Sequence, residues 1–155
     1  MILNKFKFLF FPVLFCLAYF ISSNSLLKEN DSDYLTVLGL QEKTELQKSI
    51  IRGRNIYIDF CVQCHLANGK GDMVNFPPLD RSDWLLKKRK QSIQAVKYGQ
   101  SGVILVNGNK YNNAMPYLAL ENQEVADVMN YIMNSWSNRQ NKMVTVAEVK
   151  AIIKI

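Results

Sequence analysis

The sequence of 155 residues contains one histidine, three cysteines and no series of long hydrophobic runs. A single histidine excludes metal sites that need several histidines, and iron ligation by two histidines of one chain. Three cysteines are too few for a disulfide-rich scaffold, and a polytopic membrane protein would need several spans of about 20 apolar residues. Hydrophobic residues make up 48% of the chain, which argues against disorder. The length favours one small domain with extensions.

Residues 1–23 have the pattern of a secretory signal. Two lysines precede fourteen uncharged residues, Phe8–Ile21, and small polar residues follow. A basic start, a short apolar run and a small-residue exit are typical of a signal peptide. Cleavage is expected after Ser23 or Ser25; because no A-x-A site is present, an uncleaved membrane anchor is the alternative. Either reading predicts an exported protein, in the periplasm or at the outer face of a bacterial inner membrane.

Composition divides the remaining chain into three parts. We expect a polar linker or N-terminal extension at 24–44, a folded domain at 45–137, and a C-terminal tail with a short helix at 138–155. In that tail, Thr145 and Glu148 form a capping-box pattern. The net charge is mildly positive and no long basic stripe is present. This balance, in an exported protein, argues against nucleic-acid binding.

The sequence predicts a first strong helix that begins at Glu45, is capped by Thr44 and ends at Cys61. Apolar residues recur along it at three- and four-residue steps. Gly53 interrupts the pattern, although a glycine inside a helix costs about 1 kcal/mol relative to alanine. It is either a tolerated weakness or the place where another helix crosses too closely for a side chain.

A second strong helix is predicted from about Gln123 to Trp136, because its apolar residues form one continuous stripe. Between the two helices, Ser82 or Asp83 and then Ser92 are expected to cap two short helices. A small hairpin is predicted around Asn107-Gly108. The expected fold class is therefore all-α with one β-hairpin.

The segment Cys61-Val62-Gln63-Cys64-His65 has the attachment signature of c-type haem. Two thiols one helical turn apart can add to two vinyl groups of one porphyrin, and the adjacent histidine can ligate the iron. A zinc site would lack a fourth ligand. A thioredoxin-like dithiol would need a preceding strand, and a simple disulfide would leave His65 without a role. We therefore expect one haem c, bound covalently through Cys61 and Cys64, with His65 on the iron.

A methionine is the natural second iron ligand, since no second histidine exists. Met129 and Met133 belong to the apolar helix stripe, where core packing is the usual role. Met73 follows His65 too closely, and Met143 is in the polar tail. Met115 lies in a loop fifty residues beyond His65, far enough for the chain to pass around the ring. We assign Met115 as the second ligand.

Other residues are candidates for supporting the cofactor. The second ring nitrogen of His65 needs a hydrogen-bond acceptor, for which the carbonyl of Pro77 or Pro78 is a candidate; a simple rigid turn is the alternative. Three aromatic residues suit contacts with the haem propionates and suit core packing equally well: Trp84, Tyr98 and Tyr111.

These features resemble class I cytochromes c with a single haem. The resemblance extends from about Leu46 to Trp136, and its loops and last helix are similar to cytochrome modules that work with periplasmic dehydrogenases or nitrite reductases. It implies the cytochrome c fold, with helices wrapped around one haem and the hairpin before the methionine loop. It also implies that the first and last helices cross near Gly53, with Tyr131 packed there. In those modules a serine-type cap stands where this chain has Glu121, so the helix start is expected to shift.

The resemblance implies an electron carrier without catalytic residues, which exchanges single electrons with a dehydrogenase, a reductase or a terminal oxidase. The alternative is a haem-based gas sensor or ligand-binding haem protein, which requires a labile sixth iron ligand. Lys87-Lys88-Arg89-Lys90 is the densest charge cluster. It either steers an acidic redox partner or forms an ordinary solvated helix face.

Overall fold

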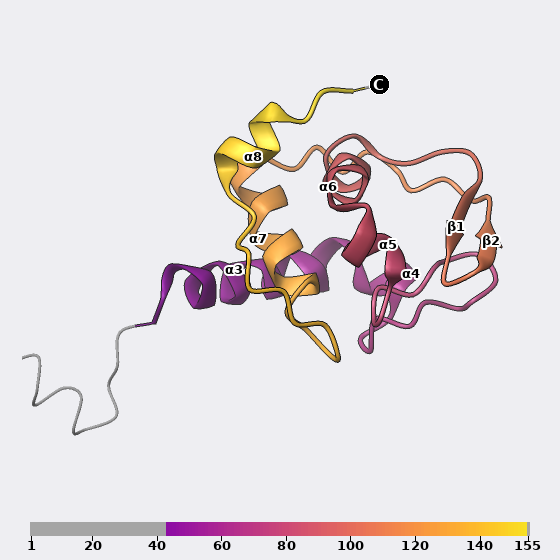
Figure 1. Cartoon of the computed structure of the whole chain (residues 1–155), viewed down its shortest axis with the longest axis horizontal. Helices are drawn as coiled ribbons and strands as arrows, with labels where there is room; N and C mark the ends of the chain where they lie inside the picture. The colour runs from indigo at the N-terminus through magenta and orange to yellow at the C-terminus, as the bar shows by residue number, and fades with distance from the viewer. Residues whose placement is uncertain (1–42, 155) are drawn as a thin grey trace, which may run out of the picture. The chain divides into compact units, whose positions relative to one another are not determined.

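The computed structural model describes residues 43–154, which contain six helices and one small sheet (Figure 1). The signal segment 1–23 and nearly all of the 24–44 extension lie outside this range. Within it, no helix has the length and apolarity to cross a membrane. The elements are α3 (Glu45–Phe60), α4 (Val62–His65), α5 (Asp83–Lys87), α6 (Arg89–Tyr98), β1 (Ile104–Val106), β2 (Asn109–Tyr111), α7 (Asn122–Ile132) and α8 (Val146–Ala151). The predicted mostly helical fold with one hairpin is confirmed.

Helices α3 and α7 cross at Gly53, which confirms the close-approach interpretation of that residue (Figure 1). A Cβ atom built on Gly53 would overlap the carbonyl oxygen of Asp127 and lie 2.9 Å from Tyr131 Cβ. The rings of Tyr57, Tyr131 and Trp136 pack against one another beside the crossing, with centroids 5.3–6.0 Å apart. The crossing therefore joins the helix that begins the domain to the helix that ends it.

A buried polar network joins the same two helices. The carboxylate of Asp127 accepts hydrogen bonds from Ser49 Oγ at 2.6 Å and from Arg52 Nε at 2.7 Å. Asn130 donates to Ser49 Oγ at 2.9 Å and to the carbonyl of Val144 at 2.9 Å. Since Asp127 and Asn130 are nearly inaccessible to solvent, these bonds satisfy groups that water cannot reach.

Two helix boundaries differ from the sequence prediction. Helix α7 ends at Ile132, one turn before Trp136, which adopts a left-handed backbone with φ 53°. The indole of Trp136 instead donates to the carbonyl of Ala67 at 2.9 Å. Helix α6 begins at Arg89, so Ser92 lies inside it, and its hydroxyl donates to Lys88 O at 3.0 Å. The apolar and capping patterns therefore predicted the correct helices, but placed the end of α7 and the start of α6 about one turn too far along the chain.

Other expected caps are confirmed. Thr44 forms a capping box with Gln47 at the start of α3, and Ser82 caps α5. The expected shift at α7 is also present: the helix begins at Asn122, and Glu121 acts as the cap in a capping box with Glu124. The carboxylate of Glu121 thus replaces the hydroxyl usual at such a position.

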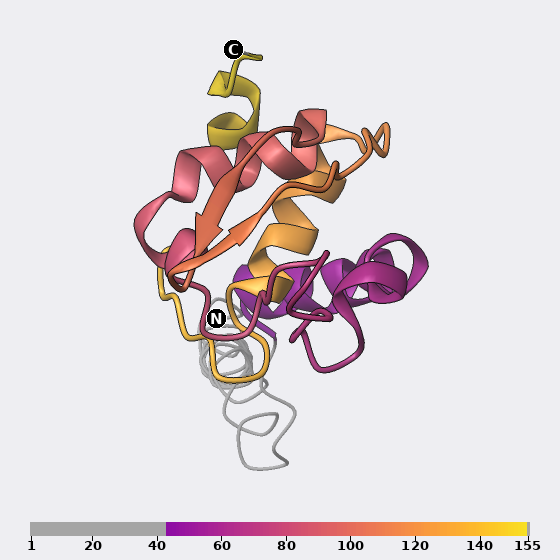
Figure 2. The ribbon, with the colours of Figure 1, turned by 90° about the vertical axis from the view of Figure 1, so that its right-hand side faces the viewer.

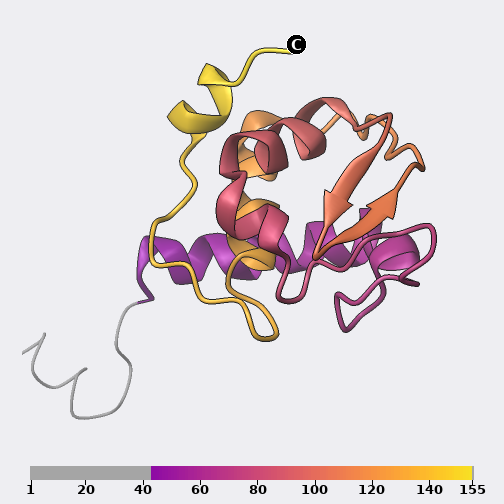
Figure 3. The ribbon, with the colours of Figure 1, turned by 45° about the vertical axis from the view of Figure 1, so that its right-hand side comes forward.

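The hairpin and the loop after α4 lie at the end of the domain away from α8 (Figures 1 and 3). Strands β1 and β2 are antiparallel, with Ile104 opposite Tyr111 (Figure 2). At the opposite end, Arg89 Nε and Glu148 Oε1 form an ion pair at 2.7 Å that attaches α8 to α6. The 87–90 cluster is therefore not a uniformly free basic face, because Arg89 is engaged in the fold.

Candidate functional site

The attachment motif spans the junction between α3 and α4. The backbone N–H groups of Cys64 and His65 both donate to the carbonyl of Cys61, at 3.2 and 2.9 Å, so the motif forms a tight helical turn. Cys61 and Cys64 are half-buried free thiols on that turn. Burial raises the pKa of the Cys61 thiol to about 11, which keeps it protonated. The two thiols are not joined in a disulfide, in contrast to one of the alternative interpretations.

His65 is fixed by a hydrogen bond to the loop that follows α4. Its Nδ1 lies 3.1 Å from the carbonyl oxygen of Pro77, so Pro77 rather than Pro78 supplies the expected acceptor. Burial lowers the pKa of His65 below its ordinary value, which favours the neutral imidazole. With Nδ1 occupied by Pro77, the neutral ring has Nε2 available as a metal ligand.

Close backbone contacts hold the Pro77 carbonyl in position. Gly71 donates its N–H to the carbonyl of His65 at 3.1 Å. A Cβ on Gly71 would overlap the carbonyl oxygen of Phe76 and lie 2.9 Å from that of Pro77. Asp72 accepts backbone hydrogen bonds from Phe76 and its two predecessors, and these bonds hold the pKa of its carboxyl far below the usual range. The loop thus needs a small residue at 71 and a carboxylate at 72.

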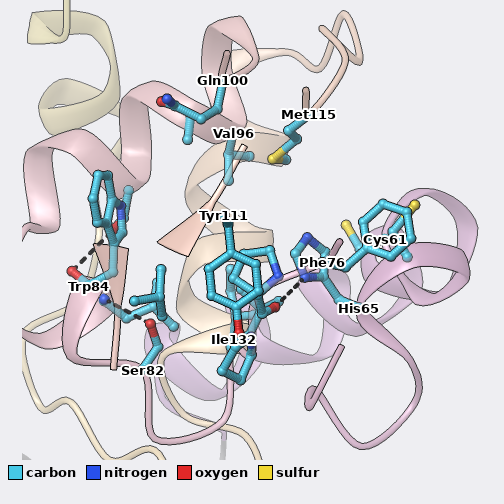
Figure 4. A pocket seen from close by; sticks show the side chains of 18 of the residues that line it. Cys61, His65, Phe76, Ser82, Trp84, Val96, Gln100, Tyr111, Met115 and Ile132 are labelled. Atoms are coloured by element: carbon cyan, nitrogen blue, oxygen red, sulfur yellow. Dashed lines mark hydrogen bonds between the residues drawn. The ribbon is translucent and has the colours of Figure 1, made fainter. Parts of the chain in front are cut away.

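A large pocket adjoins the motif (Figure 4). Its empty volume, including the part open to solvent, is about 1030 Å³, at the upper end of what cofactor sites occupy. Apolar and aromatic side chains from both strong helices, the hairpin and the loops form most of its wall. The lining includes Cys61, Cys64, His65, Phe76, Pro77, Leu79, Trp84, Leu85, Val96, Ile104, Val106, Tyr111, Met115, Val128, Met129 and Ile132.

Met115 and His65 both point into this pocket, with Met115 above it and His65 below it in the view of Figure 4. The backbone of Met115 is fixed by paired hydrogen bonds with Gln100, at 2.8 and 2.9 Å. Met129 also lines the pocket, but it belongs to the core of α7 and is fully buried. Met73 is 70% exposed. Of the sequence candidates, Met115 is therefore the loop methionine that faces the pocket.

Tyr111 supplies a polar group that sequence patterns did not distinguish from its aromatic neighbours. It is 2% exposed, and its hydroxyl has no hydrogen-bond partner within residues 43–154. Tyr98, by contrast, donates its hydroxyl to the carbonyl of Ile152 at 3.0 Å. Two free thiols, an oriented imidazole, an apolar wall and one unpaired buried hydroxyl together fit a large flat apolar cofactor that carries a polar edge.

Comparisons with known proteins agree with this site. The family model of cytochrome c matches residues 50–136. Cytochrome c-552 of Thermus thermophilus is 37% identical over 109 residues, covering 64% of this chain and 82% of that protein. The cytochrome c subunit of the quinone alcohol dehydrogenase of Gluconacetobacter polyoxogenes is 32% identical over 103 residues, covering 64% of this chain but 22% of that subunit.

The chain belongs to the cytochrome c family. It has the single-haem, class I form, and its cofactor is haem c attached through the two cysteines of the motif. The bound haem supplies an iron that accepts and releases one electron. The protein is accordingly an electron-transfer cytochrome, and the fold and cofactor predicted from the sequence are confirmed.

Proposed function

We propose that this cytochrome is an exported electron carrier whose iron is ligated by His65 and Met115. The observation that carries the proposal is the attachment of Met115 to Gln100 by two backbone hydrogen bonds beside the pocket that His65 also lines. A sulfur ligand held on a fixed loop stays bound in both oxidation states. Little rearrangement then accompanies electron transfer, as a carrier requires.

Each residue of the motif has a separate task in this proposal. Cys61 and Cys64, both half-buried, would hold the ring covalently, and the bound haem would supply the iron that takes up and releases the electron. His65 binds the iron through Nε2, while Pro77 fixes the orientation of its ring. Ligation by one histidine and one methionine would give a higher reduction potential than ligation by two histidines.

We also propose that the carrier works outside the cytoplasm with a dehydrogenase. Residues 1–23 serve as the signal or anchor, 24–44 as the connecting extension, 45–137 as the haem domain and 138–155 as its tail. Similarity to the cytochrome subunit of quinone alcohol dehydrogenases supports a dehydrogenase as one redox partner. A reductase or a terminal oxidase is the expected electron acceptor.

The absorption spectrum of the haem-loaded protein tests the ligand assignment. We expect the sulfur-to-iron band of the oxidised form in the wild type, its loss in Met115→Ala, and no reaction of the reduced wild type with carbon monoxide. Met73→Ala is the matched control, because Met73 is 70% exposed and its loss should leave the spectrum unchanged. Ready carbon monoxide binding by the wild type would instead favour a sensor or ligand-binding haem protein.

A further inference from the structure

Gly99 follows the last residue of α6 and lies directly against the backbone of the Met115 loop. Its φ is +80°, and a Cβ atom built on it would lie 2.8 Å from the carbonyl oxygen of Met115 and 3.0 Å from the nitrogen of Tyr117. These neighbours are backbone atoms, which cannot rotate away as the end of a flexible side chain can. The close approach of the two segments therefore requires glycine at this position.

The residue after Gly99 holds the same loop. Gln100 and Met115 both line the pocket (Figure 4). Their backbones exchange hydrogen bonds, at 2.9 Å from Gln100 N to Met115 O and at 2.8 Å from Met115 N to Gln100 O. The carbonyl of Met115 thus takes part both in this pairing and in the contact with Gly99. The spacing at Gly99 therefore sets where the Met115 backbone lies.

The end of α6 is itself fixed by the C-terminal tail. Lys97 Nζ donates to the carbonyls of Val149 and Ile152, at 2.8 and 2.9 Å. The hydroxyl of Tyr98 donates to the carbonyl of Ile152 at 3.0 Å. In contrast, the residues on either side of Met115 are exposed to solvent. A methyl group added at the end of α6 would therefore displace the methionine loop rather than the helix.

We propose that Gly99 is a positioning residue for the second iron ligand: because it has no side chain, the Met115 backbone packs against the end of α6, and this contact sets where the Met115 sulfur lies in the haem pocket. The inference rests on the ligation by Met115 proposed above. It gives a role in ligation to a residue that does not line the pocket. In Gly99→Ala the sulfur is displaced in a larger fraction of the molecules, and a foreign ligand then binds the iron more readily.

Imidazole binding to the oxidised, haem-loaded full chain tests the proposal, because an added imidazole nitrogen binds the iron only where the Met115 sulfur has left it. Its apparent affinity therefore increases with the fraction of molecules in which the sulfur is displaced. We expect Gly99→Ala to bind imidazole more tightly than the wild type, on the order of tenfold, and to have a weaker sulfur-to-iron band.

Gly102→Ala is the matched control for backbone strain. Gly102 has φ +81°, but nothing lies within 4 Å of a Cβ built there, so this variant should keep the wild-type band and imidazole affinity. A band and an affinity in Gly99→Ala equal to those of Gly102→Ala would overturn the proposal. Failure of the ligand assignment gives a different result: the wild type would lack the band, and Met115→Ala would bind imidazole no more tightly than the wild type.

Lys97→Met gives a second test if Gly99→Ala does not fold, because it removes the two hydrogen bonds with which the tail fixes the end of α6. It should also bind imidazole more tightly than the wild type. Lys90→Met, at an exposed position on the same helix, is its control and should keep the wild-type affinity. Equal imidazole affinities of the two lysine variants would show that the end of α6 does not position Met115, and the proposal would be wrong.

Discussion

The Nδ1 atom of His65 lies 3.1 Å from the carbonyl oxygen of Pro77, twelve residues further along the chain. This contact fixes the tautomer of the neutral imidazole and the rotation of its ring. It also gives the glycine-rich loop after the motif a definite role. The loop places a backbone acceptor behind the histidine, and Gly71 allows the chain to pass close to that acceptor.

Gly71→Ala is expected to raise the midpoint potential and to lower stability. The added methyl group would overlap the carbonyl of Phe76 and crowd that of Pro77, so the hydrogen bond to His65 would lengthen. A weaker bond makes the imidazole less basic, and the ferric iron is then less well stabilised. Overlap and backbone strain should together cost about 1–3 kcal/mol. Spectroelectrochemical titration and denaturant unfolding of the haem-loaded protein measure the two effects.

Gly102→Ala is the matched control for this substitution. Gly102 also has a positive φ, +81° against +60° for Gly71, but nothing lies within 4 Å of a Cβ built there. It should lose about 1 kcal/mol from backbone strain and keep the wild-type potential. Equal shifts of potential in both variants would show that the crowding of Pro77 is not the cause.

Gly53→Ala is expected to destabilise the protein by about 1–3 kcal/mol, although alanine is the better helix former. The methyl group would overlap the carbonyl of Asp127 and force α3 and α7 apart. Asn55→Ala is the control, because Asn55 is exposed on the same helix and gains helix propensity without a clash. Unfolding in guanidinium chloride compares the two, and a Gly53→Ala variant as stable as the wild type would contradict the steric role of Gly53.

The elements that sequence patterns predicted well are those determined by neighbouring residues. Thr44 with the apolar spacing after it defines α3, and Cys61–His65 carries the haem attachment within five residues. The end of α7 was wrong by one turn, because apolar spacing continues to Trp136 while the backbone there turns left-handed to reach Ala67. The apolar spacing predicts that Trp136 packs against the core, where it is partly buried, but does not show whether the helix includes it.

Sequence patterns did not predict the contacts that join segments distant in the chain. Asp127 bonds to Arg52 and Ser49, which lie 75 and 78 positions earlier in the sequence, so no periodicity reveals this network. Tyr111 differed from Trp84 and Tyr98 only after the structure showed which hydroxyl lacks a partner. Pro77 and Pro78 were equivalent until the loop geometry placed one carbonyl at His65.

Asp127→Ala should cost about 2–3 kcal/mol, because it removes the acceptor of the buried Ser49 hydroxyl and of the Arg52 guanidinium. Arg52 is half exposed, so water compensates part of its loss and keeps the cost at this level. Asp59→Ala, an exposed position at the end of α3, should change stability by less than about 0.5 kcal/mol. Denaturant unfolding compares the stability of the two variants, and equal losses of unfolding free energy would mean that the Asp127 network contributes little.

Glu148→Gln should lower the free energy of unfolding by about 1 kcal/mol at neutral pH, because it weakens the attachment of α8. The difference from the wild type should disappear in acid. Two hydrogen bonds from Arg89, at 2.7 and 2.9 Å, lower the pKa of Glu148 below its ordinary value of 4.5. Because the folded-state pKa is lowered, the stabilisation is complete above the unfolded-state value and is lost as the pH falls through the folded-state value.

Unfolding free energies of Glu148→Gln and the wild type, measured from pH 7 down to pH 3, test this dependence. Glu45→Gln is the control, since its pair with Lys48 at 3.2 Å is an exposed contact within one helix turn. It should lose less than about 0.5 kcal/mol. A Glu148→Gln deficit that persists undiminished at the lowest pH would show that the side chain stabilises α8 through packing rather than through its charge, and that the ion pair with Arg89 is not what holds the tail.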